Sequence, residues 1–429
     1  MRSLTFRERG TASIGSAGDL TDAEAESIAR IETRLPSDAV SWGHRALRFG
    51  PFCGVIQTPQ VAIELLPKIE RGSQAPEDMR GLLVAMLARA GELEPKRVGQ
   101  AGLGQQRSHL LDVFIEDFCD QVKAALRGGA IARYSERTEN LSAIRGRLEL
   151  TQHLRTNAFD RSHLLCRFDE RSIDNAHNRA LKAVLRMLHS RAMSARTRAI
   201  VASFLHRFDE VADVRIRIDD ISALPLDRTI RHWQLAFRKA LRLFAGLFPD
   251  VRTGDTSGSA LLFNMERLFE TVLGLRIRRE CRAIFGRHLS VELQGPTASL
   301  AISGFHLRPD ITVTDGDDIV AILDAKWKRL DTDKPNSGVT SSDAYQINTY
   351  ADRYRCKRLA LIYPATAECP PGCVTNFVLM TEVRPTLEVL AIDVREMAFG
   401  SGMPAGFEAV LSSAYERMRT PASTFLAAA

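Results

Sequence analysis

The stretch FHLRPDITVTDGDDIVAILDAKWKRL, residues 305–330, predicts two β-strands joined by a tight turn. The second strand is the apolar run IVAIL, and directly after it Asp324 and Lys326 stand two residues apart. Side chains alternate across a strand, so this acid and this base share one face. The turn returns the chain antiparallel and brings Asp310 close to Asp324. The two carboxylates share a face only if the strand pairing or a β-bulge puts them in phase.

Two carboxylates held close together are costly to bury unless a cation compensates them. Mg²⁺ suits such a pair, because it binds few carboxylates and leaves room for water and a phosphate oxygen. A lysine beside the ion can orient a water molecule or stabilise charge at phosphorus. The pattern therefore indicates hydrolysis of a phosphodiester. The alternative is that Asp324 and Lys326 are surface charges at the end of a strand, because D-x-K is a short motif.

A predicted helix upstream, ALLFNMERLFETVLGLRIRREC at residues 260–281, offers further carboxylates to this site. Glu270 is the first candidate for an additional acid. Glu266 lies one turn earlier on the same helix and could take that role instead.

A predicted helix downstream contains YQINTY, in which Gln346 and Tyr350 are four residues apart and therefore on one helix face. An amide and a hydroxyl at these positions can bind phosphate or sugar oxygens. Lys328 is predicted to follow Lys326 on the same face and to contact a DNA backbone, with a plain surface position as the alternative.

The whole chain is predicted to have an α/β fold of the mixed α+β type. Short strands are expected in ALRFGPFCGVIQTPQVAIELLPKI, residues 46–69, and long helices in the middle of the chain. The loop RTGDTSGSA, residues 252–260, marks a boundary. Three regions are therefore expected: a mixed N-terminal region at 1–125, a helical middle region at 126–250, and a C-terminal domain at 251–429 whose mixed sheet is flanked by helices.

One middle helix, in RTIRHWQLAFRKALRLFAGLF, residues 228–248, is predicted to be amphipathic. Its apolar side carries Trp233, Phe237, Ala240 and Phe244, and its other side carries Arg231, Arg238 and Arg242. These arginines are interpreted as a solvated face, with contact to a DNA backbone as the alternative.

Composition excludes several classes of protein. The chain has 429 residues and a formal net charge of +6, which permits a polyanionic partner without requiring one. Its N-terminus, MRSLTFRERG, is too polar for a signal peptide, and no apolar run is long enough to span a bilayer. Seven scattered cysteines favour a reducing, cytoplasmic location. A G-x-x-x-x-G-K-[ST] phosphate loop is absent, so any nucleotide-driven motor of that type is expected on another polypeptide.

The series RPD, LDAKWK and YQINTY resembles the core of PD-(D/E)xK nucleases that carry a Q-x-x-x-Y helix. Further matching stretches make the chain, from about residue 50 to 395, similar to the McrC family of McrBC-type restriction systems, which act on 5-methylcytosine. These stretches are VIQTPQVAIELLPKI, LSAIRGRLEL, CRFDERSIDNAHNRALKAVL and FNMERLFETVL. The ordered series is far more specific than the D-x-K motif alone, whereas the first fifty residues match nothing.

The resemblance implies a role for each candidate residue and for a partner. The catalytic residues would be Asp310, Asp324, Lys326 and Glu270, with Mg²⁺ held by the three acids and DNA bound by Gln346, Tyr350 and Lys328. The C-terminal domain would be a restriction-endonuclease-like domain, and residues 1–125 would bind an McrB-type AAA+ GTPase. That partner would use GTP, and the substrate would be methylated double-stranded DNA.

Three functions are weighed against one another. The expected function is a Mg²⁺-dependent endonuclease subunit driven by a separate AAA+ GTPase. A non-catalytic subunit for assembly and GTPase activation is a second possibility, but it gives no reason for a costly Asp310, Asp324 and Lys326 set. A stand-alone DNA nuclease similar to RecB is the third, and the large partner-like N-terminal half argues against it.

Overall fold

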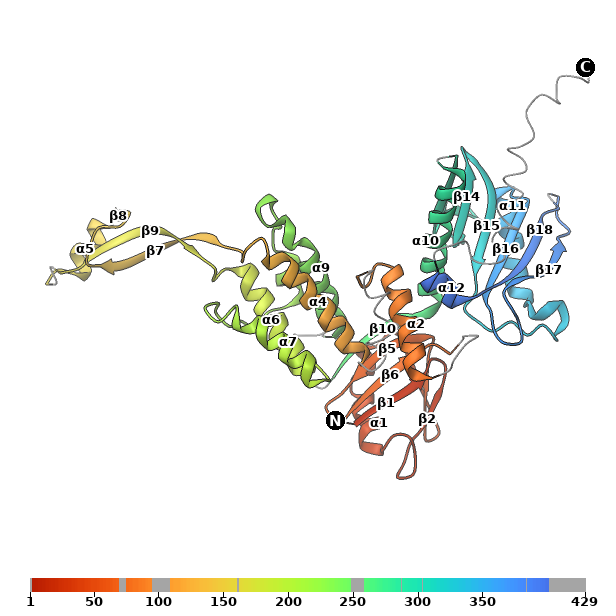
Figure 1. The fold of residues 1–429 in the computed structure, drawn as a ribbon, viewed down its shortest axis with the longest axis horizontal. Coiled ribbons are helices and arrows are strands. Elements are labelled where there is room, and N and C mark those ends of the chain that lie inside the picture. Colours follow the sequence, from red (N-terminus) through yellow and green to blue (C-terminus); the bar gives the residue numbers. More distant parts are fainter. Residues whose placement is uncertain are drawn as a thin grey trace, which may run out of the picture. The chain divides into compact units, whose positions relative to one another are not determined.

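The computed structural model describes residues 2–68, 75–94, 109–159, 162–247, 258–286, 288–302, 304–382 and 384–400 (Figure 1). The chain forms two compact units, of which the first combines residues 1–110 with 262–429 and the second comprises 111–261. These limits differ from the boundaries predicted after residues 125 and 250. Helix α4 (Leu110–Leu126) lies almost wholly in the second unit, because its apolar residues are buried there. Most of the predicted boundary loop, at 252–257, lies outside the described residues.

The N-terminal part of the first unit is mainly β-structure. In chain order it contains β1 (Arg2–Arg7), β2 (Thr11–Ser13), α1 (Asp22–Ala29), η1 (Glu32–Arg34), β3 (Val40–Gly43), β4 (Ala46–Phe49), β5 (Phe52–Gln57), β6 (Val61–Leu66) and α2 (Pro76–Arg89). One sheet has the order β1-β6-β5-β10, where β10 is Ser259–Asn264, and another has the order β2-β4-β3. The strands predicted within 46–69 are confirmed as β4, β5 and β6.

The C-terminal part of the first unit is an α/β sandwich. Its elements are α10 (Met265–Phe285), β11 (Leu289–Leu293), β12 (Ala298–Ser299), β13 (His306–Leu307), β14 (Ile311–Asp315), β15 (Asp318–Ala325), η4 (Pro335–Gly338), α11 (Ser341–Tyr354), β16 (Arg358–Pro364), β17 (Gly372–Val378), β18 (Thr386–Ile392) and α12 (Val394–Phe399). The sheet order is β11-β14-β15-β16-β18-β17, with β15, β16 and β18 parallel. The predicted mixed sheet with flanking helices is confirmed.

Apolar side chains hold helix α11 against this sheet. Ile347 and Ala351 of α11 belong to one buried cluster with Ile322, Leu361 and Val389 of the central strands. Helix α10 contacts β11 and β15, and it also packs against α12 and α2 (Figure 1). Because α2 belongs to the N-terminal part, this packing joins the two parts of the first unit.

The helix predicted from residue 260 begins later than expected. Residues Ser259–Asn264 form β10, and α10 starts at Met265. The Asn264 side chain accepts a hydrogen bond from the amide of Arg267 and so caps the helix. The apolar run LLF pairs with β5 rather than entering the helix, which periodicity alone could not distinguish.

The second unit contains a helical bundle and a protruding β-structure. Its elements are α4, β7 (Arg133–Leu141), β8 (Arg147–Leu148), α5 (Leu150–Thr156), β9 (Leu164–Ser172), α6 (Ala176–Arg191), α7 (Ala195–His206), α8 (Ile218–Ser222), η3 (Arg228–Trp233) and α9 (Gln234–Leu247). Residues 133–172 form a three-stranded sheet of order β7-β9-β8 with α5 at its end, which we call the finger (Figure 1). Helices α4, α6 and α9 match predicted helical segments, whereas α5, α7 and α8 were not predicted individually. The finger strands were not predicted, because β7 is exposed along nearly its whole length and shows no apolar alternation.

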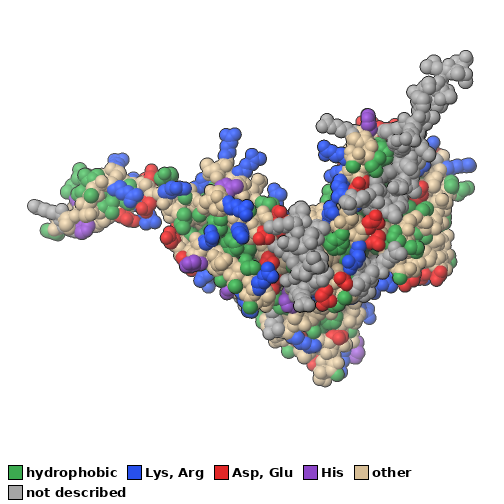
Figure 2. Space-filling model, in the orientation of Figure 1, with side chains coloured by type: hydrophobic (Ala, Val, Ile, Leu, Met, Phe, Trp, Pro, Cys, Tyr) green, Lys and Arg blue, Asp and Glu red, His purple; other side chains and the backbone are tan. Residues whose placement is uncertain are grey.

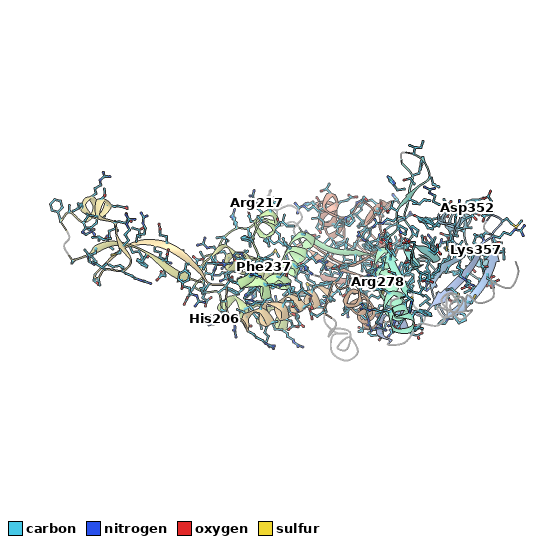
Figure 3. All side chains as sticks on the ribbon, turned by 90° about the horizontal axis from the view of Figure 1, so that it is seen from above. His206, Arg217, Phe237, Arg278, Asp352 and Lys357 are labelled. Carbon is cyan, nitrogen blue, oxygen red and sulfur yellow. The ribbon has the colours of Figure 1, made fainter. Side chains whose placement is uncertain are left out.

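The bundle core matches the predicted amphipathic pattern of residues 228–248. Trp233, Phe237, Ala240 and Phe244 are all buried. Phe237 lies among the helices, while His206 and Arg217 lie on the surface of the bundle (Figure 3). No helix among the described residues is both long and apolar enough to cross a membrane.

A buried ion pair stabilises the N-terminal part. Arg80 of α2 donates two hydrogen bonds to Glu64 of β6, at 2.7 and 2.6 Å, and the backbone amide of Leu110 donates a third at 3.1 Å. Both charged side chains are at most one-tenth exposed. Removing one partner leaves a buried charge without compensation, which is strongly destabilising.

We therefore expect Arg80→Met to lower the free energy of unfolding by roughly 3–5 kcal/mol, measured by urea denaturation. The matched control is Arg30→Met, because Arg30 pairs with Glu26 at 3.0 Å on the surface of α1. That change should cost less than about 0.5 kcal/mol. Equal losses in the two variants would contradict the role given to the buried pair.

Candidate active site

The register of two antiparallel strands brings Asp310 and Asp324 together. Ile311 of β14 pairs with Leu323 of β15, so Asp310 lies opposite Asp324 on the same face of the sheet. The Asp310 carboxylate accepts a hydrogen bond of 2.9 Å from the amide of Ala325. A register shift lies between Val313 and Thr314, toward the turn, and leaves this pairing in phase. The strand pairing itself, rather than a β-bulge, therefore puts the two carboxylates on one face.

Lys326 lies directly beside this pair of acids. Its amide donates to the carbonyl of Ile362 at 2.9 Å, which continues the pairing of β15 with β16 by one residue. Its Nζ lies 2.6 Å from Oδ2 of Asp324 and donates to Oε1 of Gln346 at 2.9 Å. The ammonium group is thus fixed on two sides at the carboxyl end of β15.

Burial controls the protonation of these groups. Asp324 is only 1% exposed, and its Oδ1 accepts no hydrogen bond from any residue that the structure describes. Burial raises the pKa of Asp324 and, with the nearby charges of Asp324 and Glu270, raises the pKa of Asp310 to about 7. Burial lowers the pKa of Lys326, but the surrounding carboxylates outweigh this and raise it overall. The site has more buried negative charge than Lys326 alone compensates.

The two candidate acids on α10 differ in their environment. Burial raises the pKa of Glu270, whose Oε1 accepts a hydrogen bond from the side chain of Gln294. Glu266 is about half exposed and pairs with Arg9 at 2.6 Å. Glu270 is therefore the better placed of the two to act together with Asp310 and Asp324.

Gln346 and Tyr350 lie on one face of α11, as their spacing predicted. Gln346 Nε2 donates to the Tyr350 hydroxyl at 3.0 Å, while its Oε1 accepts from Lys326. Tyr350 is only 4% exposed, and its hydroxyl lies 3.3 Å from the carbonyl of Arg308, to which it donates. Gln346 therefore contacts Lys326, whereas Tyr350 contacts Gln346 from the side away from the lysine.

Asp343 is a site residue that was missed in the sequence. It is buried, it accepts a hydrogen bond from Lys328, and it lies 3.7 Å from Lys326 Nζ. Burial alone would raise its pKa, but the hydrogen bonds from Lys328 and Thr340 lower it overall. A signal was present, because Asp343 stands three residues before Gln346 on the same helix face. Lys328 is therefore partly neutralised by Asp343 rather than free to point at a ligand.

These groups line one cleft with a volume of about 380 Å³. The charged and polar side chains around it are Arg9, Glu266, Glu270, Asp310, Asp324, Lys326, Lys328, Asp343 and Gln346. All the predicted site residues except Tyr350 are thus at its wall.

The cleft offers two facing carboxylates as ligands for a divalent cation. Among the described residues, no group of three or more His, Cys, Asp or Glu side chains is close enough to form a ready-made metal site. Mg²⁺ does not need one, since it is commonly bound by one or two carboxylates with water and phosphate oxygens completing its shell. The unbonded Oδ1 of Asp324 and the facing carboxylate of Asp310 match that requirement.

A family model and two solved structures match this chain. A family model described as McrBC 5-methylcytosine restriction system component matches residues 47–364. A structure of a half-complex from a tetradecameric assembly of Thermococcus gammatolerans McrB AAA+ hexamers with bound McrC contains a similar chain. The similarity has a TM-score of 0.74 at 15% identity and covers 97% of this chain and 100% of that one.

A second similar chain comes from the cryo-EM structure of the Thermococcus gammatolerans McrBC complex. Its TM-score is 0.52 at 17% identity, and the match covers 65% of this chain and 88% of that one. At such low identity these two structures establish a shared fold alone. A comparison with curated proteins gives no match.

The raised pKa of Asp310 predicts a pH-dependent stability. The folded protein holds this proton up to a pKa of about 7, whereas the unfolded chain releases it near pH 4. Stability from this group is therefore fully present below about pH 4 and is lost as the pH rises to about 7.

We expect Asp310→Asn to be more stable than wild type at pH 8, by roughly 1–3 kcal/mol, with the difference shrinking toward pH 4. Urea denaturation between pH 4 and 8, without divalent cations, measures this difference. Asp331→Asn, at an exposed position, is the control and should follow wild type at every pH. A stability difference for Asp310→Asn that stayed constant with pH would refute the assignment.

Proposed function

Because the chain belongs to the McrBC 5-methylcytosine restriction system family, we propose that it is the endonuclease subunit of such a system. It hydrolyses phosphodiester bonds in double-stranded DNA that carries methylated cytosine, and a separate McrB-type AAA+ GTPase drives it. The neighbouring solved structure, in which McrC is bound to McrB AAA+ hexamers, supports this partner. GTP is used by the partner and not by this chain, which has no phosphate loop of the Walker type.

One observation carries the nuclease assignment. The carboxylates of Asp310 and Asp324 face each other at the wall of a cleft, and Lys326 lies 2.6 Å from Asp324. Together the two carboxylates carry more negative charge than this one lysine compensates. Such a cluster destabilises the fold, and a role in binding a cation and a phosphate explains it. The non-catalytic alternative leaves it without a purpose.

The chain's own residues divide the chemistry among them. Asp310 and Asp324, assisted by Glu270, would hold Mg²⁺. When bound, that ion polarises the phosphate and increases the acidity of a coordinated water. Lys326 has a raised pKa and is protonated at neutral pH, so it stabilises the negative charge that develops as water attacks phosphorus. Gln346 orients the lysine through its 2.9 Å hydrogen bond.

The test is cleavage of methylated and unmethylated plasmid by this chain with its AAA+ partner, Mg²⁺ and GTP. We expect Lys326→Ala to slow cleavage of the methylated plasmid by about 10²–10³-fold and Asp324→Ala by at least as much. Lys334→Ala is the matched control, because Lys334 pairs with Asp331 on the surface of the same segment. It should cleave like wild type.

The other outcomes separate the alternatives. Equal cleavage by all four proteins would place the active site elsewhere. Absence of cleavage by any of them, together with stimulated GTP hydrolysis, would favour the non-catalytic activating subunit. Cleavage by wild type without the partner would favour a stand-alone nuclease.

The finger is the surface that best fits the partner. Its exposed large apolar side chains are Tyr134, Ile144, Leu150, Leu154 and Phe159, each more than half exposed. Tyr134 lies near the base of the finger, where β7 begins, and the other four belong to its outer part, where apolar side chains gather (Figure 2). Clustered exposed apolar residues commonly mark protein interfaces. This site lies outside residues 1–125, where partner binding was predicted, and it adds a second contact to that prediction.

We expect Leu154→Ser combined with Phe159→Ser to weaken binding to the AAA+ partner by at least about tenfold, because an interface anchor is lost. Biolayer interferometry measures the affinity, and excess partner should restore plasmid cleavage. Val214→Ser changes an exposed apolar residue outside the finger and serves as the control. Unchanged affinity in the double variant would remove the finger from the interface.

A further inference from the structure

A buried tryptophan stands between the two lysines of the cleft. At Trp327 the chain turns sharply, because the amide of Lys328 donates to the carbonyl of Lys326 at 2.9 Å. The indole is only 2% exposed and packs against Phe269 of α10, with 5.2 Å between ring centroids. The position of this ring therefore fixes the turn from which the side chains of Lys326 and Lys328 extend.

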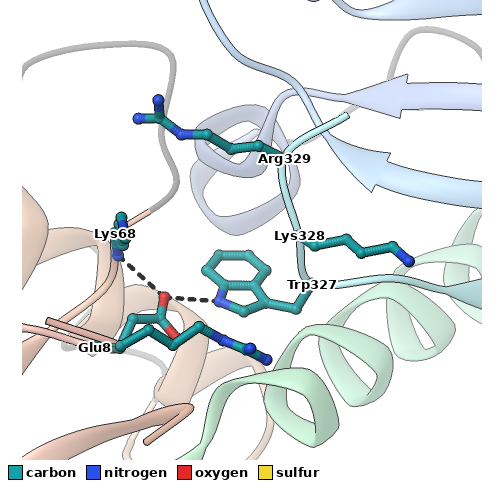
Figure 4. A pocket seen from close by; sticks show the side chains of 6 residues that line it. Glu8, Lys68, Trp327, Lys328 and Arg329 are labelled. Atoms are coloured by element: carbon teal, nitrogen blue, oxygen red, sulfur yellow. Dashed lines mark hydrogen bonds between the residues drawn. The ribbon is translucent and has the colours of Figure 1, made fainter. Parts of the chain in front are cut away.

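The N-terminal part supplies the group that holds this ring. The indole Nε1 of Trp327 donates to Oε1 of Glu8 at 2.7 Å, and the amide of Lys68 donates to the same oxygen at 3.0 Å (Figure 4). Glu8 directly follows strand β1, and its amide donates to the carbonyl of Leu66 at 2.9 Å. The carboxylate is thus fixed by its own backbone and by two donors.

Glu8 is an expensive residue for a purely structural contact. It is only 1% exposed, and its Oε2 accepts no hydrogen bond from the described residues. A buried carboxylate oxygen without a donor costs free energy. In return, a charged acceptor makes a stronger hydrogen bond to the indole than a neutral one. A stronger hydrogen bond holds the Trp327 ring more firmly in its position.

A second contact reaches the cleft from the next residue. Arg9 has a left-handed backbone with φ of 55°, and its amide donates to the carbonyl of Gly50 at 3.0 Å. Its guanidinium pairs with Glu266 of α10 at 2.6 Å, at the wall of the cleft. Residues 8 and 9 therefore touch both the segment that carries the catalytic lysine and the helix that carries the auxiliary acid.

We infer that Glu8 is a positioning residue for the nuclease reaction, acting on Lys326 through Trp327. The N-terminal sheet controls the geometry of the cleft by this bond, so a partner that binds the N-terminal part can regulate cleavage through it. This inference rests on the proposed nuclease function for its kinetic consequence, but the structural link itself is independent of that function.

The first test is kinetic and uses the full chain with its AAA+ partner, Mg²⁺, GTP and methylated plasmid. Glu8→Ala and Trp327→Phe each remove the bond, and we expect each to lower the turnover number about tenfold or more with KM for DNA unchanged. Glu8→Gln keeps a weaker, neutral acceptor for the indole, so its turnover should lie between those of wild type and Glu8→Ala. The double variant should be no slower than either single one, because both remove the same bond.

The chain offers a matched control in the same N-terminal part. Trp42 donates its indole N–H to Glu32 at 2.9 Å, but this ring is 38% exposed and lies outside the residues that line the cleft. Trp42→Phe and Glu32→Ala should leave turnover unchanged. A loss of turnover in these variants equal to that of the Trp327 and Glu8 variants would overturn the inference, as would wild-type turnover in a folded Trp327→Phe.

The second test does not need nuclease activity. Hydrogen–deuterium exchange of the full chain should show faster exchange over residues 325–330 in Glu8→Ala, and a smaller increase there in Glu8→Gln, which keeps a weaker, neutral acceptor. Wild-type protection over these residues in Glu8→Ala would overturn the inference. If wild type exchanges as expected but never cleaves DNA, the proposed function fails while the positioning link stands.

Discussion

The strand register holds the carboxylates of Asp310 and Asp324 side by side, with Asp324 buried and Asp310 partly buried, and the rest of the site is arranged around this costly pair. Burial raises the pKa of both carboxylates, and the charge of Asp324 raises that of Asp310 further. Lys326 compensates only part of this charge, because it meets Asp324 through one oxygen while the other oxygen accepts no hydrogen bond from the described residues. The arrangement persists because the strand register forces it, and it leaves negative charge at the cleft that Lys326 alone does not compensate.

The fold explains why the groups meet at this point. Antiparallel pairing of β14 with β15 brings Asp310 opposite Asp324, and parallel pairing of β15 with β16 carries the chain on to Lys326. Helix α11 then crosses the same face and adds Gln346 and Asp343. Ligands commonly bind at the carboxyl ends of parallel strands, where loops can diverge, and this cleft follows that rule.

Local sequence patterns predict the strands and helices of the site, whereas contacts between residues far apart in the sequence leave no such pattern. Strand and helix periodicity anticipated β14, β15 and α11, and a spacing of four placed Gln346 with Tyr350 on one face. Asp343 carried a readable signal in its spacing from Gln346 but was overlooked. Glu8 and Trp327 are more than three hundred residues apart, and no local pattern links them. The finger strands were missed because charged side chains cover both faces of β7 and conceal the alternation on which strand prediction depends.

The contact between Glu8 and Trp327 gives the N-terminal sheet a physical means to influence the chemistry. Lys326 compensates Asp324 through a single contact of 2.6 Å, so a small shift of the lysine changes how much of that carboxylate's negative charge is compensated. The turn at Trp327 sets the lysine's position, and Glu8 sets the position of the turn. A displacement of the N-terminal sheet that alters this one hydrogen bond would therefore alter the position of Lys326 directly.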